Sequence, residues 1–97
     1  MKLEYHPSTI GDLNHAIGFY EGQRPGLGDE CRVEVYAAID RIHQSPNRHR
    51  IIGDDIRRCF VRRFPFSILY RVMDDEIIRI LVIRHHRQRA SYGRSRR

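Results

Sequence analysis

The spacing of apolar residues changes once along this chain, close to Arg50, and that change limits the folds open to it. Before Arg50 the apolar residues recur at intervals of three and four, which is typical of helices with one buried face. After it they alternate with polar residues, which is typical of strands. The 97 residues can build only one hydrophobic core. We therefore expect a single α+β domain spanning 1–97, with an arginine-rich C-terminal tail from about residue 84.

The first half is predicted to hold a short strand and a helical hairpin. Lys2 to His6 alternates as a strand does, and Pro7 and Ser8 then favour the start of a helix that ends near Glu21. The apolar face of this helix consists of Ile10, Leu13, Ile17 and Tyr20. After the glycine-rich turn, the second helix has an apolar face of Cys31, Val35, Ile39 and Ile42 and stops at Ser45-Pro46-Asn47.

Three strands should follow. In the first, Arg57 to Arg63, the residues Arg58, Phe60 and Arg62 should face outward if Cys59 and Val61 face the core. The second covers Ser67 to Val72, and Met73-Asp74-Asp75-Glu76 supplies the turn to the third. That last strand, Ile77 to Arg84, is apolar on both faces except at Arg79, which indicates a central position. The expected order is β-α-α-β-β-β, with the helical hairpin packed on one face of an antiparallel sheet and the other face left for function.

Positive charge is concentrated in the second half. Residues 1–49 hold five cations and seven carboxylates, a net charge of −2, whereas residues 50–97 hold thirteen arginines and five carboxylates, a net charge of +8. Such a surface attracts nucleic acid or an acidic protein, although a solvated basic surface is the simpler alternative. Guanidinium groups suit either partner, because they bind phosphate and carboxylate in a bidentate manner.

Several classes of function are not indicated. Cys31 and Cys59 lie at apolar positions without a Cys-x-x-Cys companion, so we interpret both as core thiols. The adjacent His85 and His86 have no carboxylate or thiol at ligand spacing, and we expect neither a metal nor another cofactor. No signal peptide is recognisable and no apolar run approaches the about 18 residues of a membrane span. We expect a cytoplasmic protein that does not interact with membranes.

Several strings of residues along the chain are distinctive when they are taken together. In the first half these are Phe19-Tyr20-Glu21, Pro25-Gly26-Leu27-Gly28 and Ser45-Pro46. In the second half they are Ile56-Arg57-Arg58, Arg62-Arg63-Phe64-Pro65-Phe66-Ser67-Ile68-Leu69-Tyr70-Arg71-Val72, Ile80-Leu81-Val82-Ile83, His85-His86-Arg87-Gln88-Arg89 and Tyr92. The Arg-Phe-Pro-Phe turn followed by Tyr-Arg-Val is the most specific of them. Together these strings resemble the RelE/ParE superfamily of bacterial type II toxins.

The resemblance implies a toxin that inhibits growth and is neutralised by a cognate antitoxin in a hetero-oligomer. RelE-like members are ribonucleases that cut messenger RNA in the ribosomal A site, whereas ParE-like members poison DNA gyrase. The ParE-like branch is favoured here, because two positions that are basic in RelE-like enzymes match Phe60 and Ser67, which offer no cation. A ribosome-dependent ribonuclease and a degenerate, antitoxin-binding member remain the alternatives.

Two sets of candidate site residues follow from the resemblance. If the chain is a ribonuclease, the catalytic candidates are Arg58, His86, Arg87 and Tyr92, in which arginine offsets phosphate charge and histidine moves a proton. The candidates for binding the target or the antitoxin are Arg62, Arg63, Phe64, Arg84, His85 and Arg89, and Phe64, Pro65 and Phe66 could together form an exposed apolar knob. Tyr92 could instead anchor the tail to the sheet. Because the apolar stripes end by Ile83, removal of the tail from Arg87 onward is expected to leave the fold intact.

Overall fold

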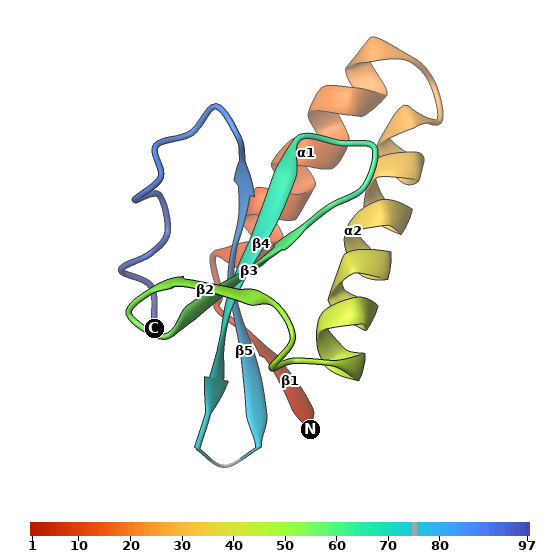
Figure 1. Cartoon of the computed structure of the whole chain (residues 1–97). Coiled ribbons are helices and arrows are strands. Elements are labelled where there is room, and N and C mark those ends of the chain that lie inside the picture. Colours follow the sequence, from red (N-terminus) through yellow and green to blue (C-terminus); the bar gives the residue numbers. More distant parts are fainter. Residues whose placement is uncertain (75) are drawn as a thin grey trace.

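A five-stranded sheet carries both helices on one face (Figure 1). The computed structural model describes residues 1–74 and 76–97. In chain order its elements are β1 (Lys2–Tyr5), α1 (Thr9–Gln23), α2 (Leu27–Gln44), β2 (Arg50–Gly53), β3 (Ile56–Phe60), β4 (Phe66–Met73) and β5 (Ile77–His85). The predicted α+β class and the helical hairpin are confirmed. In the described chain, neither helix is both long and apolar enough for a bilayer crossing.

The strands are ordered β1-β5-β4-β3-β2, so β5 is central as predicted. The sheet is mixed rather than wholly antiparallel, because β1 pairs with β5 in parallel. No tight turn joins these two strands, so nothing forces them into an antiparallel pair. The sequence also did not reveal β2, whose four residues are too few for a period of two to be recognised. Met73 pairs with Ile77 as expected for the predicted turn, in which Asp75 lies outside the described residues.

A β-bulge in β5 divides the apolar residues between the two faces of the sheet. Leu69 pairs with Val82 and Tyr70 pairs with Ile80, so Leu81 has no partner across the strand. An extra residue of this kind shifts the alternation of side chains by one. As a result, Leu81 and Val82 both leave the helix side and join Ile56 and Leu69 in a second buried cluster on the opposite face.

The main core lies between the sheet and the helices. The apolar stripe of α2 is buried as predicted, and the inward positions of β3 and the following residue, Cys59 and Val61, are confirmed. On α1 the prediction fails at Ile10, which is 60% exposed. Thr9 takes the buried position instead, because its hydroxyl donates a 3.1 Å hydrogen bond to the carbonyl of Leu81 at the bulge.

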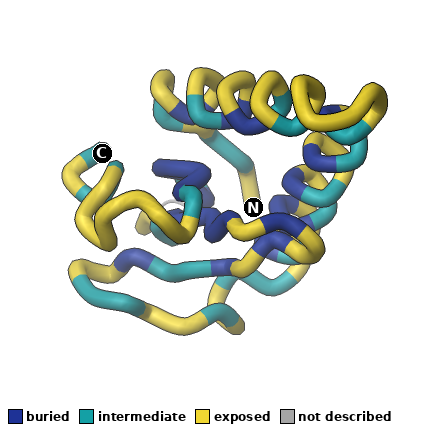
Figure 2. The backbone as a smooth tube through the Cα atoms, turned by 90° about the horizontal axis from the view of Figure 1, so that it is seen from above, coloured by how far each residue is buried: buried dark blue, intermediate teal, exposed yellow. Residues whose placement is uncertain are grey.

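The chain that follows β5 crosses the face opposite the helices (Figure 1). At Gly93 the backbone comes so close to the sheet that an added Cβ would lie 2.6 Å from Cβ of Val82. Arg94 donates to the carbonyl of Ile52, and Arg96 donates to that of Leu81. Figure 2 shows buried stretches at the centre and exposed ones along the outer side of the helices and the tail. The buried apolar residues do end at Ile83, but the tail beyond them packs against the sheet and is part of the fold.

Candidate functional site

A row of three side chains crosses the face opposite the helices near the end of the sheet where β5 passes into the tail. Phe60 of β3 pairs with Ser67 of β4, which in turn pairs with Arg84 of β5. Cross-strand neighbours of this kind lie on the same face of a sheet. The small Ser67, fully buried between two large side chains, leaves room there for groups from outside the row. Together with Arg58 and His86, these residues form what we call the cationic recess.

His86 enters the cationic recess from the first residues of the tail. Its backbone N–H donates to the carbonyl of Pro65 at 2.9 Å, which extends the pairing beyond β5. Its Nε2 lies 3.1 Å from the hydroxyl of Ser67, and its ring meets Phe60 edge-on at 5.7 Å. Arg58 also contacts Phe60, with its Cζ over the face of the ring at 4.6 Å from the centroid. Two predicted site residues, Arg58 and His86, are thus held on the same aromatic ring.

Arg84 is a buried cation with few partners. It is 9% exposed, and its recorded hydrogen bond is a long one from Nη1 to the carbonyl of Gln88, at 3.3 Å. Among the described residues, its Nε and that of Arg58 are buried without an acceptor. Burial lowers the pKa of Arg84, and the nearby positive charges of Arg58 and Arg94 lower it further. Within residues 1–74 and 76–97, no carboxylate forms an ion pair with Arg58 or Arg84.

The other two predicted catalytic residues, Arg87 and Tyr92, line a different part of the surface. They border a hollow of about 860 Å³ that also includes residues of α1 and β5. There the hydroxyl of Tyr92 donates to Asp12 at 3.4 Å, and the guanidinium of Arg96 lies 5.3 Å from the centroid of its ring. These contacts link Tyr92 to α1, whereas the alternative placed its anchor on the sheet. The predicted catalytic set is therefore divided, with Arg58 and His86 in the cationic recess and Arg87 and Tyr92 beside α1.

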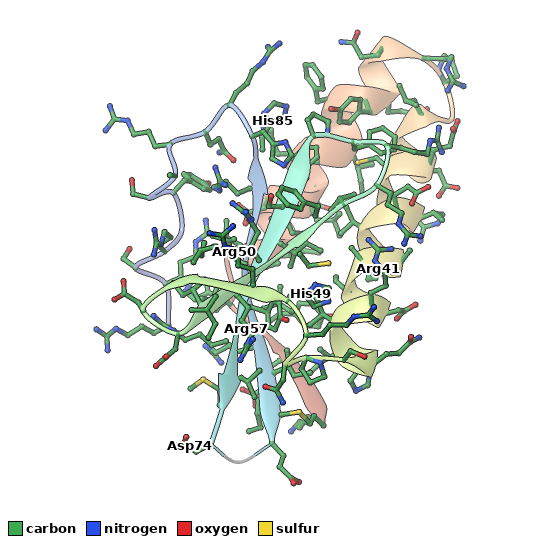
Figure 3. All side chains as sticks on the ribbon, viewed as in Figure 1. Arg41, His49, Arg50, Arg57, Asp74 and His85 are labelled. Atoms are coloured by element: carbon green, nitrogen blue, oxygen red, sulfur yellow. The ribbon has the colours of Figure 1, made fainter. Side chains whose placement is uncertain are left out.

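His85 lies where β5 passes into the tail, at the opposite end of the β4–β5 hairpin from Asp74 (Figure 3). Its ring packs edge-on against Phe66 at 5.0 Å, and its Nδ1 accepts the backbone N–H of Arg87 at 2.9 Å. Burial lowers the pKa of this imidazole, and the charges of Arg87 and His86 lower it further. The neutral imidazole of His85 therefore fixes the backbone at the start of the tail by accepting this hydrogen bond.

The loop between β3 and β4 contains the remaining predicted binding residues. Arg63 has φ of 70° and pairs with Glu30 of α2 at 2.7 Å, while Arg62 is exposed. Phe64 is only 7% exposed and packs against Tyr20, with ring centroids 4.8 Å apart. The expected apolar knob is therefore wrong, because Phe64 and Phe66 both complete the main core. Arg89, in the tail, is exposed.

A second basic group surrounds the junction of α2 and β2, where Figure 3 shows Arg41, His49 and Arg57. Arg57 donates to the carbonyls of Asn47 and His49 at 3.0 and 2.8 Å, and Arg41 donates to the carbonyl of Phe60. Burial, and then the nearby arginines, lower the pKa of His49. These arginines satisfy backbone carbonyls, so their role is structural.

The sequence reasoning missed Asp12, Arg94 and Arg96, which fix the tail to the rest of the molecule. Asp12 occupies a polar position of α1 that carried no signal of a buried role, and the two arginines were not distinguished from their neighbours in the tail. In the described part of the chain, no group of three His, Cys, Asp or Glu residues could hold a metal ion. The chemistry that the cationic recess offers is the binding of an oxoanion by guanidinium groups.

Comparison with known proteins identifies relatives along most of the chain. Residues 3–90 match the family described as ParE toxin of the type II toxin–antitoxin system parDE. The Toxin ParE2 proteins of two Mycobacterium tuberculosis strains, CDC 1551 / Oshkosh and ATCC 25618 / H37Rv, are each 32% identical over 85 residues, which cover 87% of this chain and 80% of theirs. A solved chain from the chromosomal ParDE TA system of P. aeruginosa superposes with a TM-score of 0.78 at 21% identity, covering 88% of this chain and 95% of that one.

Proposed function

Because this chain belongs to the family of ParE toxins of type II toxin–antitoxin systems, we propose that it inhibits growth by binding DNA gyrase and that a cognate antitoxin neutralises it in the cytoplasm. That it is a toxin of the ParDE kind follows from the family match and from the ParE2 relatives. Our proposal adds to this the target, DNA gyrase, and the neutralisation by an antitoxin.

The main reason to propose gyrase binding rather than RNA cleavage is the pair Phe60 and Ser67. Phe60 and Ser67 face each other on β3 and β4, at the positions where the resemblance to RelE-like ribonucleases would place basic residues. RNA cleavage needs cations beside the phosphate in the transition state, and loss of one preorganised donor typically lowers the rate by a factor of about 100 or more. Arg87 and Tyr92 line a hollow beside α1 whose lining does not include Arg58, which supports the same choice.

The proposal is tested with purified toxin and gyrase in a supercoiling assay, together with detection of cleaved DNA trapped on the enzyme. We expect inhibition that disappears when the cognate antitoxin is added in equimolar amount. The same toxin should leave messenger RNA intact on programmed ribosomes. Normal supercoiling at a toxin concentration that stops growth in cells would contradict the gyrase target.

A ribosome-dependent ribonuclease is the second candidate, and one observation favours it. The Ser67 hydroxyl and His86 Nε2 are in hydrogen-bonding contact, and Arg58 lies on the same Phe60 ring as His86. An oriented imidazole beside a cation is the minimum that acid–base cleavage of RNA requires. Cleavage in the A site that falls at least about 100-fold in both His86→Ala and Arg58→Ala would establish this activity. A protein that binds antitoxin but acts on neither target would be the degenerate member.

A further inference from the structure

Some arginines on the face opposite the helices form an ion pair with a carboxylate of the same chain, and others do not. Arg96 has the carboxylate of Asp12 at 2.6 Å, and Arg79 has that of Glu4 at 3.2 Å. Arg84 is the more buried residue, yet in the described chain it has no carboxylate partner, and neither has Arg58. The fold therefore pairs the arginines that hold the tail and β1 in place and leaves the cationic recess without a counter-ion.

An unpaired buried cation is unfavourable for the free protein. Removing a guanidinium from water has a desolvation cost that a carboxylate or several hydrogen bonds must offset. For Arg84 the structure records one long hydrogen bond, from Nη1 to the Gln88 carbonyl at 3.3 Å, and Arg58 and Arg94 add repulsion. Arg94 itself lies 3.9 Å from Asp54, a side chain that is 81% exposed and so a weak counter-charge. An anion supplied from outside would remove this penalty.

We infer that the cationic recess binds a single carboxylate of the cognate antitoxin, between Arg84 and Arg58. This inference rests on the antitoxin partnership proposed above. It names the chemical group of the partner that Arg84 and Arg58 would bind. Of these two residues, only Arg84 was among the predicted binding residues. A guanidinium binds a carboxylate through two parallel hydrogen bonds, which fixes the orientation of the group as well as its charge.

The burial of Arg84 favours a carboxylate over the phosphate of a nucleic acid. Arg84 is 9% exposed, so its ligand must be a terminal group on a flexible stem, as in aspartate or glutamate. A phosphodiester carries a sugar on both sides and requires an open groove along the backbone. At the rim, Phe60 is 54% exposed and offers an apolar surface to the residue next to the acidic one. An acidic residue followed by an apolar residue is thus the pattern expected in the antitoxin segment.

The experiment compares antitoxin binding and toxin stability in three variants. The ligand is the protein encoded next to the toxin gene, and its Kd is measured at several salt concentrations. Arg84→Met and Arg58→Gln should each weaken binding at least about tenfold and reduce its dependence on salt. Arg48→Gln, which removes the same charge from an exposed position, should stay within about threefold of wild type.

Thermal unfolding of the free toxin shows whether Arg84 binds the antitoxin or instead stabilises the toxin fold. Arg84→Met should leave Tm unchanged or raise it, because methionine replaces a buried charge that has no carboxylate partner in the described chain. A lower Tm with unchanged antitoxin affinity would overturn the inference. The inference would also be overturned if Arg84→Met and Arg58→Gln bound a single-stranded oligonucleotide more weakly but bound the antitoxin as wild type does. The recess would then be a phosphate site. If the wild-type toxin does not bind the antitoxin at all, the proposed function itself fails.

Discussion

The carboxylate of Asp12 on α1 and the guanidinium of Arg96 in the tail lie 2.6 Å apart, although they are 84 positions apart in the sequence. Their side chains are 7% and 15% exposed. Asp12 also accepts the backbone N–H of Ile83 at 3.1 Å, next to the bulge of β5. One carboxylate therefore connects the first helix, the central strand and the C-terminal tail.

Removal of either partner of this ion pair should destabilise the fold. Arg96→Ala leaves the buried carboxylate of Asp12 without its counter-ion, and we expect the free energy of unfolding to fall by about 3 kcal/mol. The double variant Asp12→Ala/Arg96→Ala should lose less than the sum of the two single variants. Urea denaturation of all four proteins gives the coupling energy. Additive losses would show that the pair contributes no interaction of its own.

Truncation from Arg87 onward should weaken the fold, contrary to what the apolar stripes alone predict. The deletion removes the Arg96 ion pair, and it removes the backbone at Gly93 that packs on Val82 of the second cluster. The loss of the ion pair alone is worth about 3 kcal/mol, a large part of the 5 to 15 kcal/mol that typically stabilises a domain. Circular dichroism during heating measures the effect. The point variant Arg89→Ala, at an exposed position of the tail, should melt like wild type.

Gly93 should not tolerate a side chain. Its φ is +76°, and a Cβ would approach Val82 to 2.6 Å, so Gly93→Ala must displace the tail from the sheet. We expect a loss of about 1 to 3 kcal/mol. Gly18→Ala is the matched control, because nothing lies within 4 Å of a Cβ at this exposed position of α1. That substitution should increase stability by about 0.5 to 1 kcal/mol, as measured by chemical denaturation.

Tyr70 should make the fold sensitive to alkaline pH. Burial raises its pKa to about 12, and its hydroxyl donates a 2.6 Å hydrogen bond to the carbonyl of Pro46. An unfolded tyrosine ionises near pH 10, so the unfolded state loses its proton first. The free energy of unfolding contributed by this group is fully present below pH 10 and is lost as the pH rises through about 12. Denaturation curves from pH 8 to 12 should show this loss in the wild type and a smaller one in Tyr70→Phe. Equal slopes in the two proteins would contradict the assignment.

The sequence was sufficient wherever burial repeats at a regular short interval. The stripe from Cys31 to Ile42 recurs at the helical period, and all four of its residues are buried in α2. Cys59 and Val61 alternate with outward-facing side chains, and the continuous apolar run of the last strand indicated that β5 is central. These features depend on which side of a single element faces the core, and neighbours along the chain carry that information.

The tertiary structure alone decided how residues distant in sequence meet. The bulge at Leu81 turns two apolar residues to the second face, and it exposes carbonyls that make Thr9 rather than Ile10 the buried residue of α1. The path of the tail places Arg87 and Tyr92 in a hollow beside α1, and it brings Arg96 to Asp12. Periodicity contains no signal for such contacts, because each depends on the three-dimensional course of two segments, whereas a periodic pattern reports only the environment of one.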